Sequence, residues 1–249
     1  MKRIMLTVAY DGTCYNGWQI QPGVITIESV LNETLTELLH EDIKVIGAQR
    51  TDSGVHAEGA VCVFDTDSTI PGDRFCFALN PVLPDDIRIR ASREVEADFH
   101  PRRVPCKKTY RYRIWNDAFS LPTNSRYTHL VHTELDVKKM AEAAEYLIGT
   151  HDFKSFCSAG SQAETTVRTI YDIKITKTGK EIDIDVTGNG FLYNMVRIIA
   201  GTLTEAGRGK ITPSDMEGIL ESKDRSMAGL TAPAKGLTLL GYEWKQDVI

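Results

Sequence analysis

The sequence predicts an α+β fold made of two similar halves, each with the element order β-α-β-β-α-β. Two observations carry this prediction. Apolar residues alternate with polar ones in the expected strands and recur at three-and-four spacing in the expected helices. The same order of elements then occurs twice along the 249 residues, a length that suits one large domain or two of ordinary size.

The first half opens with an apolar strand from Ile4 to Tyr10. A helix follows, predicted by the spacing of Ile27, Leu31 and Leu35. The remaining elements of this half are a short strand at 43–48, a strand at 60–64, a helix at 72–79 and a strand at 87–95.

The second half begins with a strand from Cys106 to Trp115, in which Tyr110 and Tyr112 alternate with arginines. An amphipathic helix is expected near 137–147. The remaining elements are strands at 167–176 and 181–186, helices at 193–206 and after Pro213, and a closing strand at 237–244.

Split β-α-β units of this kind pack their helices on one face of an antiparallel sheet. We therefore expect two ferredoxin-like halves, residues 1–104 and 105–249, with their sheets side by side and a central cleft. No low-complexity linker separates the halves, so we expect them to pack rigidly.

Composition and charge exclude several classes of protein. With 42% hydrophobic and 25% charged residues, the chain has a globular composition, and no stretch approaches the roughly 20 apolar residues of a membrane span. The five cysteines are widely spaced, which argues against a disulfide framework or a zinc knuckle and favours a reducing cytoplasm. The histidines show no metal-ligand spacing, and no metal is expected. The net charge of −5 argues against indiscriminate nucleic-acid coating but leaves local RNA contacts open.

The densest chemical signal is the segment Gly47 to Ala57, where small residues carry Arg50, Asp52 and His56 through a tight loop. An aspartate near an arginine stays ionised, which suits a carboxylate nucleophile better than a general acid. The alternative is a turn in which Asp52 merely caps the next segment.

The second signal is a basic segment, Phe99 to Asn116, which contains no acidic residue. Cations contact phosphates and aromatic faces stack on unpaired bases, so this mixture suits structured RNA. A solvated strand face with core tyrosines explains the pattern equally well. The candidate RNA-binding residues are Arg102, Arg103, Lys107 and Lys108, with Tyr110 as the candidate base contact.

The third signal is a glycine-punctuated turn, Gly188-Asn189-Gly190, that leads into a helix carrying Arg197. Arg197 is expected one turn into this helix, where it can point toward the cleft, although an ordinary surface arginine has the same pattern. The turn is not a phosphate-binding loop, because no third glycine or Lys-Ser/Thr pair follows.

Together these segments resemble the TruA-type family of tRNA pseudouridine synthases, from about residue 4 to 244. In the first half the matching motifs are Tyr10-Asp11-Gly12-Thr13, Gly17-Trp18-Gln19 and Arg50-Thr51-Asp52-x-Gly54-Val55-His56-Ala57. In the second half they are Phe99-His100, Lys108-Thr109-Tyr110-Arg111-Tyr112, Gly149-x-His151-Asp152-Phe153 and Phe191-Leu192-Tyr193-Asn194-Met195-Val196-Arg197. Gln49 and Ser53 depart from a family glycine and a family alanine.

The resemblance implies the pseudouridine synthase fold and an isomerase that converts uridine to pseudouridine at positions 38, 39 and 40 of the tRNA anticodon stem and loop. It implies a homodimer that grips the tRNA without metal or organic cofactor. It also implies that Asp52 is the nucleophile, Tyr110 contacts the substrate, Arg50 fills the vacated base stack, and Arg197 pairs with Asp52.

Two other classes compete with this interpretation. A non-catalytic RNA-binding module needs no carboxylate, so the joint presence of Asp52, Tyr110 and Arg197 argues against it. A hydrolase that uses Asp52 and His56 lacks a recognisable oxyanion donor or metal set.

Overall fold

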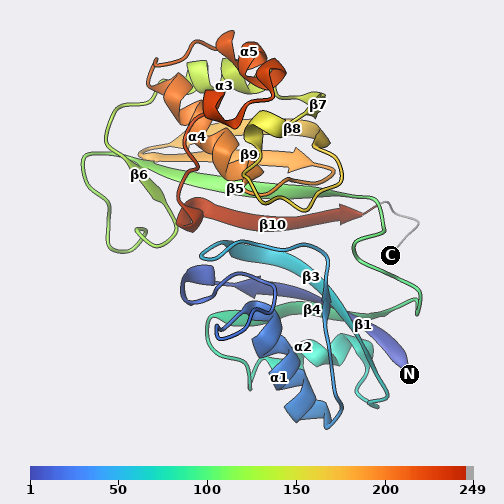
Figure 1. The fold of residues 1–249 in the computed structure, drawn as a ribbon. Helices are drawn as coiled ribbons and strands as arrows, with labels where there is room; N and C mark the ends of the chain where they lie inside the picture. The colour runs from blue at the N-terminus through green and yellow to red at the C-terminus, as the bar shows by residue number, and fades with distance from the viewer. Residues whose placement is uncertain (245–249) are drawn as a thin grey trace. The chain divides into compact units, whose positions relative to one another are not determined.

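The computed structural model describes residues 1–244, and the chain divides into two compact units (Figure 1). Unit 1 comprises Met1–Cys106 together with residues 239–244, and unit 2 comprises Lys107–Thr238. The units are defined by which residues pack together and not by sequence order alone. The last strand, β10 (Leu237–Trp244), therefore begins in unit 2 and continues in unit 1. The limits 1–104 and 105–249 for two folding domains stay a prediction.

Unit 1 contains an antiparallel sheet in the order β4-β1-β3, with β2 and β10 also paired to β3. The order of elements and the position of β3 between β1 and β2 are those of a split β-α-β unit. Its elements are β1 (Lys2–Tyr10), α1 (Ile27–Leu39), β2 (Ile46–Gly47), β3 (His56–Thr66), α2 (Phe75–Leu79) and β4 (Ile87–Val95).

Both faces of the unit 1 sheet carry apolar side chains, because successive strand residues point to opposite faces. In β1, Ile4 and Leu6 are fully buried, as are Leu31 and Leu35 of α1. Helix α1 starts with a reciprocal pair of hydrogen bonds between Thr26 and Ser29. On the opposite face of β1, a second cluster forms from Met5, Ala48, Val61, Val63 and Phe99, with Val104, Tyr242 and Trp244 packed against it.

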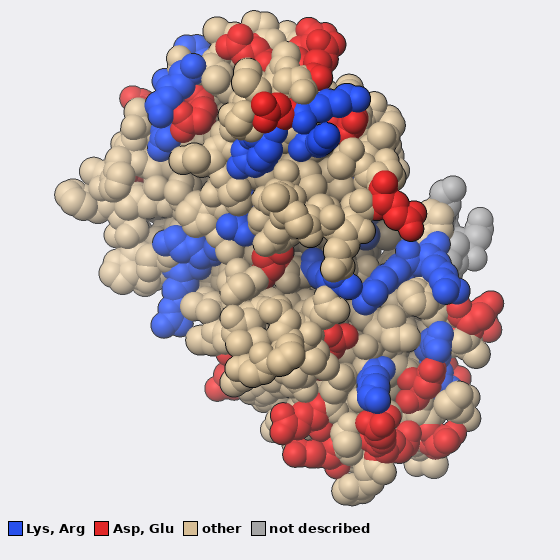
Figure 2. All heavy atoms as spheres, viewed as in Figure 1, with Lys and Arg blue, Asp and Glu red and all other residues tan. Residues whose placement is uncertain are grey.

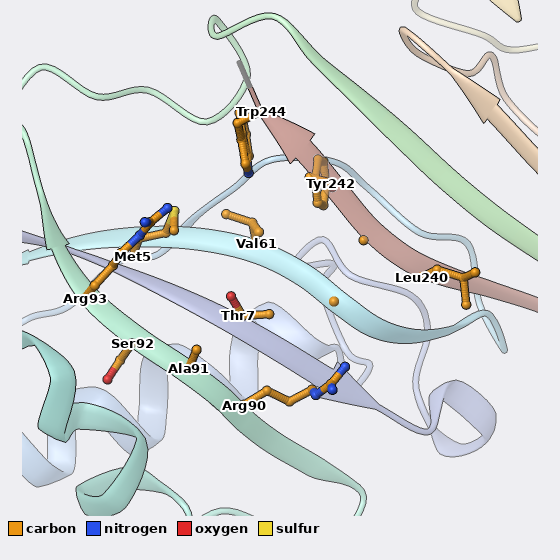
Figure 3. A pocket seen from close by; sticks show the side chains of 12 residues that line it. Met5, Thr7, Val61, Arg90, Ala91, Ser92, Arg93, Leu240, Tyr242 and Trp244 are labelled. Carbon is orange, nitrogen blue, oxygen red and sulfur yellow. The ribbon is translucent and has the colours of Figure 1, made fainter. Parts of the chain in front are cut away.

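A pocket of about 430 Å³ opens beside this second cluster (Figure 3). The rings of Tyr242 and Trp244 stack along one side, with their centroids 5.4 Å apart and their planes at 12°. Arg90 and Arg93 of β4 line the other side. None of the residues singled out by the sequence for chemistry lines this pocket.

Unit 2 contains a sheet in the order β5-β9-β8-β7, with the short strand β6 parallel to β5. Ile182, Ile184 and Val186 alternate along β9 and are fully buried. The elements are β5 (Cys106–Asn116), β6 (His129–Val131), α3 (Val137–Glu145), β7 (Gly149–Asp152), β8 (Val167–Thr178), β9 (Glu181–Gly188), α4 (Met195–Gly207) and α5 (Asp215–Ser222).

The structure confirms the α+β class and the expected order of elements, with local differences. The strand expected at 43–48 shrinks to two residues, because Ile43 and Val45 donate their N–H groups to side chains of α1, Thr36 Oγ1 and Asn32 Oδ1. Helix α4 starts at Met195 because Asn194 adopts a left-handed conformation with φ 61°. No helix within residues 1–244 has the length and apolar character of a membrane span.

Candidate active site

The loop between β2 and β3 carries Arg50 and Asp52. Its tip is a tight turn, in which the Asp52 carbonyl accepts a 3.1 Å hydrogen bond from Val55 N–H. Gly54 occupies the left-handed region with φ 75°, which glycine adopts without steric cost. Asp52 is half-buried and Arg50 is exposed, so both side chains lie at the surface of the fold.

A second loop, residues 11–18, supports the candidate catalytic loop, residues 48–55, through its backbone. Trp18 N–H donates to the Thr51 carbonyl at 3.1 Å, and Gly54 N–H donates to the Tyr15 carbonyl at 3.3 Å. The Thr51 hydroxyl also bonds the Tyr10 hydroxyl at 2.8 Å, and burial raises the pKa of Tyr10, which keeps that hydroxyl neutral. Asp52 therefore projects from a backbone fixed on both sides.

Three glycines allow this close approach. A Cβ on Gly12 would lie 2.0 Å from the Val55 carbonyl oxygen, and one on Gly17 would lie 2.5 Å from the Thr51 oxygen. A Cβ on Gly47 would lie 2.4 Å from Nε1 of Trp18, which is buried beneath β2. The sequence motifs around residues 10–19 thus belong to the site as its support, a role that their residue types alone did not indicate.

His56 follows the loop and is buried. Its Nδ1 accepts a 3.1 Å hydrogen bond from Gly12 N–H and also lies 3.1 Å from Asp11 Oδ1. This contact fixes the ring to the supporting loop, which gives His56 a structural role and weakens the hydrolase alternative.

In unit 2, Tyr110 lies on β5 opposite Val186 and is 3% exposed. Its ring packs edge-to-face against Phe191, with centroids 5.3 Å apart and planes at 89°. Phe191 in turn lies against Gly188, where a Cβ would come within 3.2 Å of the ring. The turn before α4 therefore fixes the orientation of Tyr110.

Arg197 lies in the first turn of α4, because the helix starts at Met195. Its Nη1 donates to Asn194 Oδ1 at 2.7 Å and its Nε donates to the Ala232 carbonyl at 2.7 Å. Asn194 is itself held by Ser158, whose hydroxyl accepts from Nδ2 at 3.0 Å. These bonds orient the guanidinium. Burial raises the pKa of Tyr112, and the positive charge of Arg197 opposes that rise.

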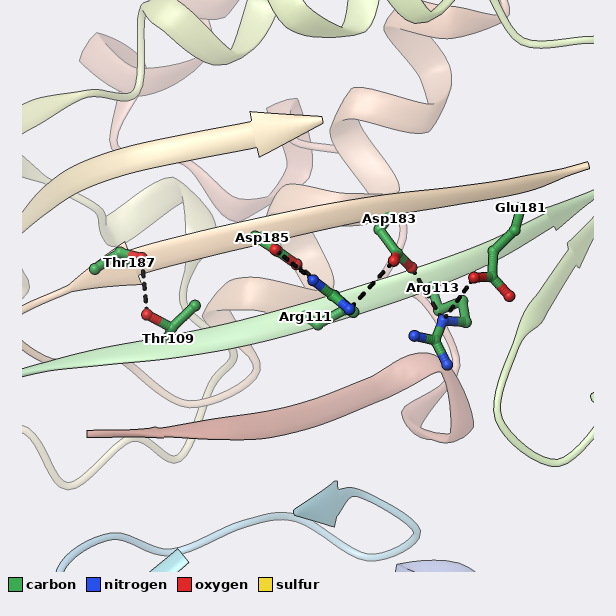
Figure 4. A network of polar contacts seen from close by, with 7 residues as sticks. All are labelled: Thr109, Arg111, Arg113, Glu181, Asp183, Asp185 and Thr187. Carbon is green, nitrogen blue, oxygen red and sulfur yellow. Dashed lines mark hydrogen bonds and ion pairs between the residues drawn. The ribbon is translucent and has the colours of Figure 1, made fainter. Parts of the chain in front are cut away.

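The basic segment splits into two groups of residues. Arg111 forms a two-point pair with Asp185, with both N–O distances 2.7 Å, and Arg113 donates to Asp183 at 3.0 Å (Figure 4). These residues face each other across β5 and β9, so the register of the sheet neutralises both arginines. Figure 2 shows lysines and arginines in several separate groups among acidic residues on the face in view.

The four remaining cations of the segment are divided between the two units. In unit 1, Arg102 Nε donates to the Gly47 carbonyl at 2.7 Å, and Arg103 is exposed. In unit 2, Lys107 Nζ lies 5.2 Å from the centre of the Tyr171 ring, and Lys108 is half-buried.

Comparison with known proteins identifies the class. A family model described as tRNA pseudouridine synthase matches residues 6–102 and 143–244, which include Asp52 and Arg197 and leave Tyr110 in the gap. This match covers most of the chain and defines it as a pseudouridine synthase, an isomerase.

Full-length relatives agree. Proteins named tRNA pseudouridine synthase A are 46% identical in Thermoanaerobacter sp. strain X514 over 240 residues, covering 96% of this chain and 98% of the relative. The Brevibacillus brevis protein is 49% identical with the same coverage, and the Bacillus subtilis protein is 46% identical, covering 95% and 97%. The chain belongs to the tRNA pseudouridine synthase family.

Gly17→Ala tests the support beneath the loop. The new Cβ would lie 2.5 Å from the Thr51 oxygen, so the loop must shift, and a shift of about 1 Å costs on the order of 100-fold in rate. We expect that loss in the release of tritium from tRNA labelled at uracil C5, which reports each isomerisation.

Gly23→Ala is the matched control, because Gly23 also has a positive φ, 77°, but nothing lies within 4 Å of its Cβ position. It carries only the backbone cost of about 1 kcal/mol. Equal rates for the two variants would contradict the role of the close approach.

Proposed function

We propose that this enzyme isomerises uridines 38, 39 and 40 in the anticodon stem and loop of tRNA, in the cytoplasm, as a homodimer and without metal or organic cofactor. The rigidly supported loop that presents Asp52 carries the proposal. The identity of 46–49% to full-length relatives named tRNA pseudouridine synthase A supports the choice of substrate.

Asp52 acts as the nucleophile in this proposal. The reaction breaks the bond between ribose C1′ and uracil N1, turns the base and joins C1′ to C5, while C5 loses a proton and N1 gains one. A stacked base exposes neither face fully, so the uridine must leave the helix at a cost of a few kcal/mol. Arg50, exposed two residues before Asp52, fills the vacated position.

Tyr110 and Arg197 serve the same reaction. The orientation of Tyr110 is fixed by Phe191, which suits a residue that stacks on or hydrogen-bonds the displaced base. Arg197 supplies a fixed positive charge, and a nearby opposite charge keeps a carboxylate ionised. We propose that Arg197 keeps Asp52 in its reactive, charged form.

Asp52→Asn abolishes turnover and leaves folding and tRNA binding nearly intact. An amide has the size of the carboxylate but cannot act as nucleophile or base. Wild type is expected to release tritium from C5-labelled tRNA even in excess chelator, and the variant none above background.

Glu58→Gln controls for the lost charge, because Glu58 is an exposed carboxylate shortly after the loop. It is expected to turn over at the wild-type rate. Substantial tritium release by the Asp52 variant at an unchanged melting temperature would remove Asp52 from the mechanism.

The phosphate contacts come from Arg102, Arg103, Lys107 and Lys108. Replacing each by a neutral residue lowers the slope of log affinity against log salt by about 0.7 to 0.9 per lost contact, for every tRNA alike. Filter binding across a salt series measures this slope. Lys44→Gln, at an exposed lysine outside the segment, leaves it unchanged. A fourfold variant with wild-type affinity and slope would make these residues an ordinary solvated surface.

Light scattering tests the homodimer. At micromolar concentration we expect roughly twice the chain mass of 27.8 kDa. The same measurement with tRNA added gives the number of tRNA molecules bound per dimer. A monomer with full activity would contradict this part of the proposal.

A further inference from the structure

The segment from Phe99 to Val104 contacts both the sheet of unit 1 and the catalytic loop. Phe99 is buried, and it packs with Met5, Val61 and Ala48 in the second cluster. Ala48 lies in the catalytic loop, directly after β2, so one side of this cluster belongs to the loop itself. The segment therefore rests on the loop as well as on the sheet.

Arg3 fixes the start of this segment. Its guanidinium pairs with Asp65 through two bonds of 2.8 and 2.7 Å, and its Nη1 also donates to the Phe99 carbonyl at 2.9 Å. Arg3 and Asp65 face each other across β1 and β3. The pair holds the pKa of the Asp65 carboxyl below its usual value, so this anchor stays charged at neutral pH.

Arg102 fixes the other end, at the last residue of β2, directly before the loop. Its Nε donates to the Gly47 carbonyl at 2.7 Å. The turn before it is shaped by His100, whose carbonyl accepts from Arg103 N–H at 2.9 Å and whose Nδ1 accepts from Arg102 N–H at 3.3 Å. Gly47 is buried, and an unsatisfied buried carbonyl is costly.

Gly47 is a sensitive point because β2 has only two residues. Directly after Gly47, Ala48 N–H donates to the Val61 carbonyl of β3 at 2.8 Å. Further along, the Thr51 carbonyl accepts from Trp18 N–H of the supporting loop. Gly47 and Ala48 therefore fix the point at which the chain leaves the sheet and enters the loop.

We propose that Arg102 is a positioning residue for the catalytic loop, acting through the Gly47 carbonyl, in addition to contacting RNA. The Nε bond uses one N–H of the guanidinium fork, and the N–H groups on Nη1 and Nη2 are the further donors that a phosphate accepts from. This inference rests on the proposed role of Asp52.

The test compares Arg102→Met with Arg74→Met. Both remove one positive charge from an exposed arginine of unit 1, and Arg74 contacts its neighbours Asp73 and Phe77. Single-turnover tritium release is measured with enzyme in saturating excess, which cancels any loss of affinity. We expect a loss of about 10- to 100-fold for Arg102→Met and a wild-type rate for Arg74→Met.

Amide hydrogen exchange tests the contact between Arg102 and Gly47 independently of catalysis. The amides of Ala48 and Val55 are expected to exchange faster in Arg102→Met, while amides in the centre of β1 keep wild-type protection. If Arg102→Met fails to fold, Arg102→Lys and Arg74→Lys replace the pair: both keep the positive charge and the salt slope, and only Arg102→Lys slows the single-turnover rate.

Wild-type rates and exchange in the Arg102 variants would overturn the inference. So would a rate loss that disappears at saturating enzyme, since Arg102 would then act in binding alone. A wild-type enzyme that releases no tritium would instead overturn the proposed function, and the exchange measurement would still decide whether Arg102 orders the loop.

Discussion

The backbone hydrogen bonds between residues 15–18 and 51–54 are the interaction on which the site depends. The loop that carries Asp52 has almost no strand pairing of its own, since β2 ends at Gly47. Its Thr51 carbonyl and Gly54 N–H are satisfied by a second loop, through Trp18 and Tyr15. Buried backbone groups need such partners. Two loops that pair with each other thus replace the sheet as the source of order around Asp52.

Much of the fold could be predicted from the sequence, because its strands and helices have strong apolar periodicity. The limits of β4 and β10 are those expected, and α1 begins where its apolar spacing begins. The prediction of a strand over residues 43–48 was wrong for most of its length because of tertiary contacts. Side chains of α1 accept the N–H groups of Ile43 and Val45. The strands β6 and β7, of three and four residues, are too short to show an alternating pattern.

The candidate site could be predicted only in part. A composition count treats every cation between residues 99 and 116 alike, but the pairing register places Arg111 and Arg113 opposite Asp185 and Asp183. Those acidic residues lie more than sixty positions away, as the separations of the hydrogen bonds show. Likewise, the sequence presented Arg102 as a phosphate contact, whereas its bond to Gly47 spans 55 positions. Side-chain partners set by long-range pairing do not show in local pattern.

Asp52 must meet two opposing demands, and the glycines around it show how the fold satisfies both. In the proposed mechanism the carboxylate needs open space for an extruded base. The backbone below it supplies order without occupying that space, and two backbones approach this closely only where side chains are absent. Gly12 and Gly17 provide that approach to Val55 and Thr51, while Gly47 gives room to the buried indole of Trp18. Their lack of a side chain, rather than any chemical group, is what they contribute to the site.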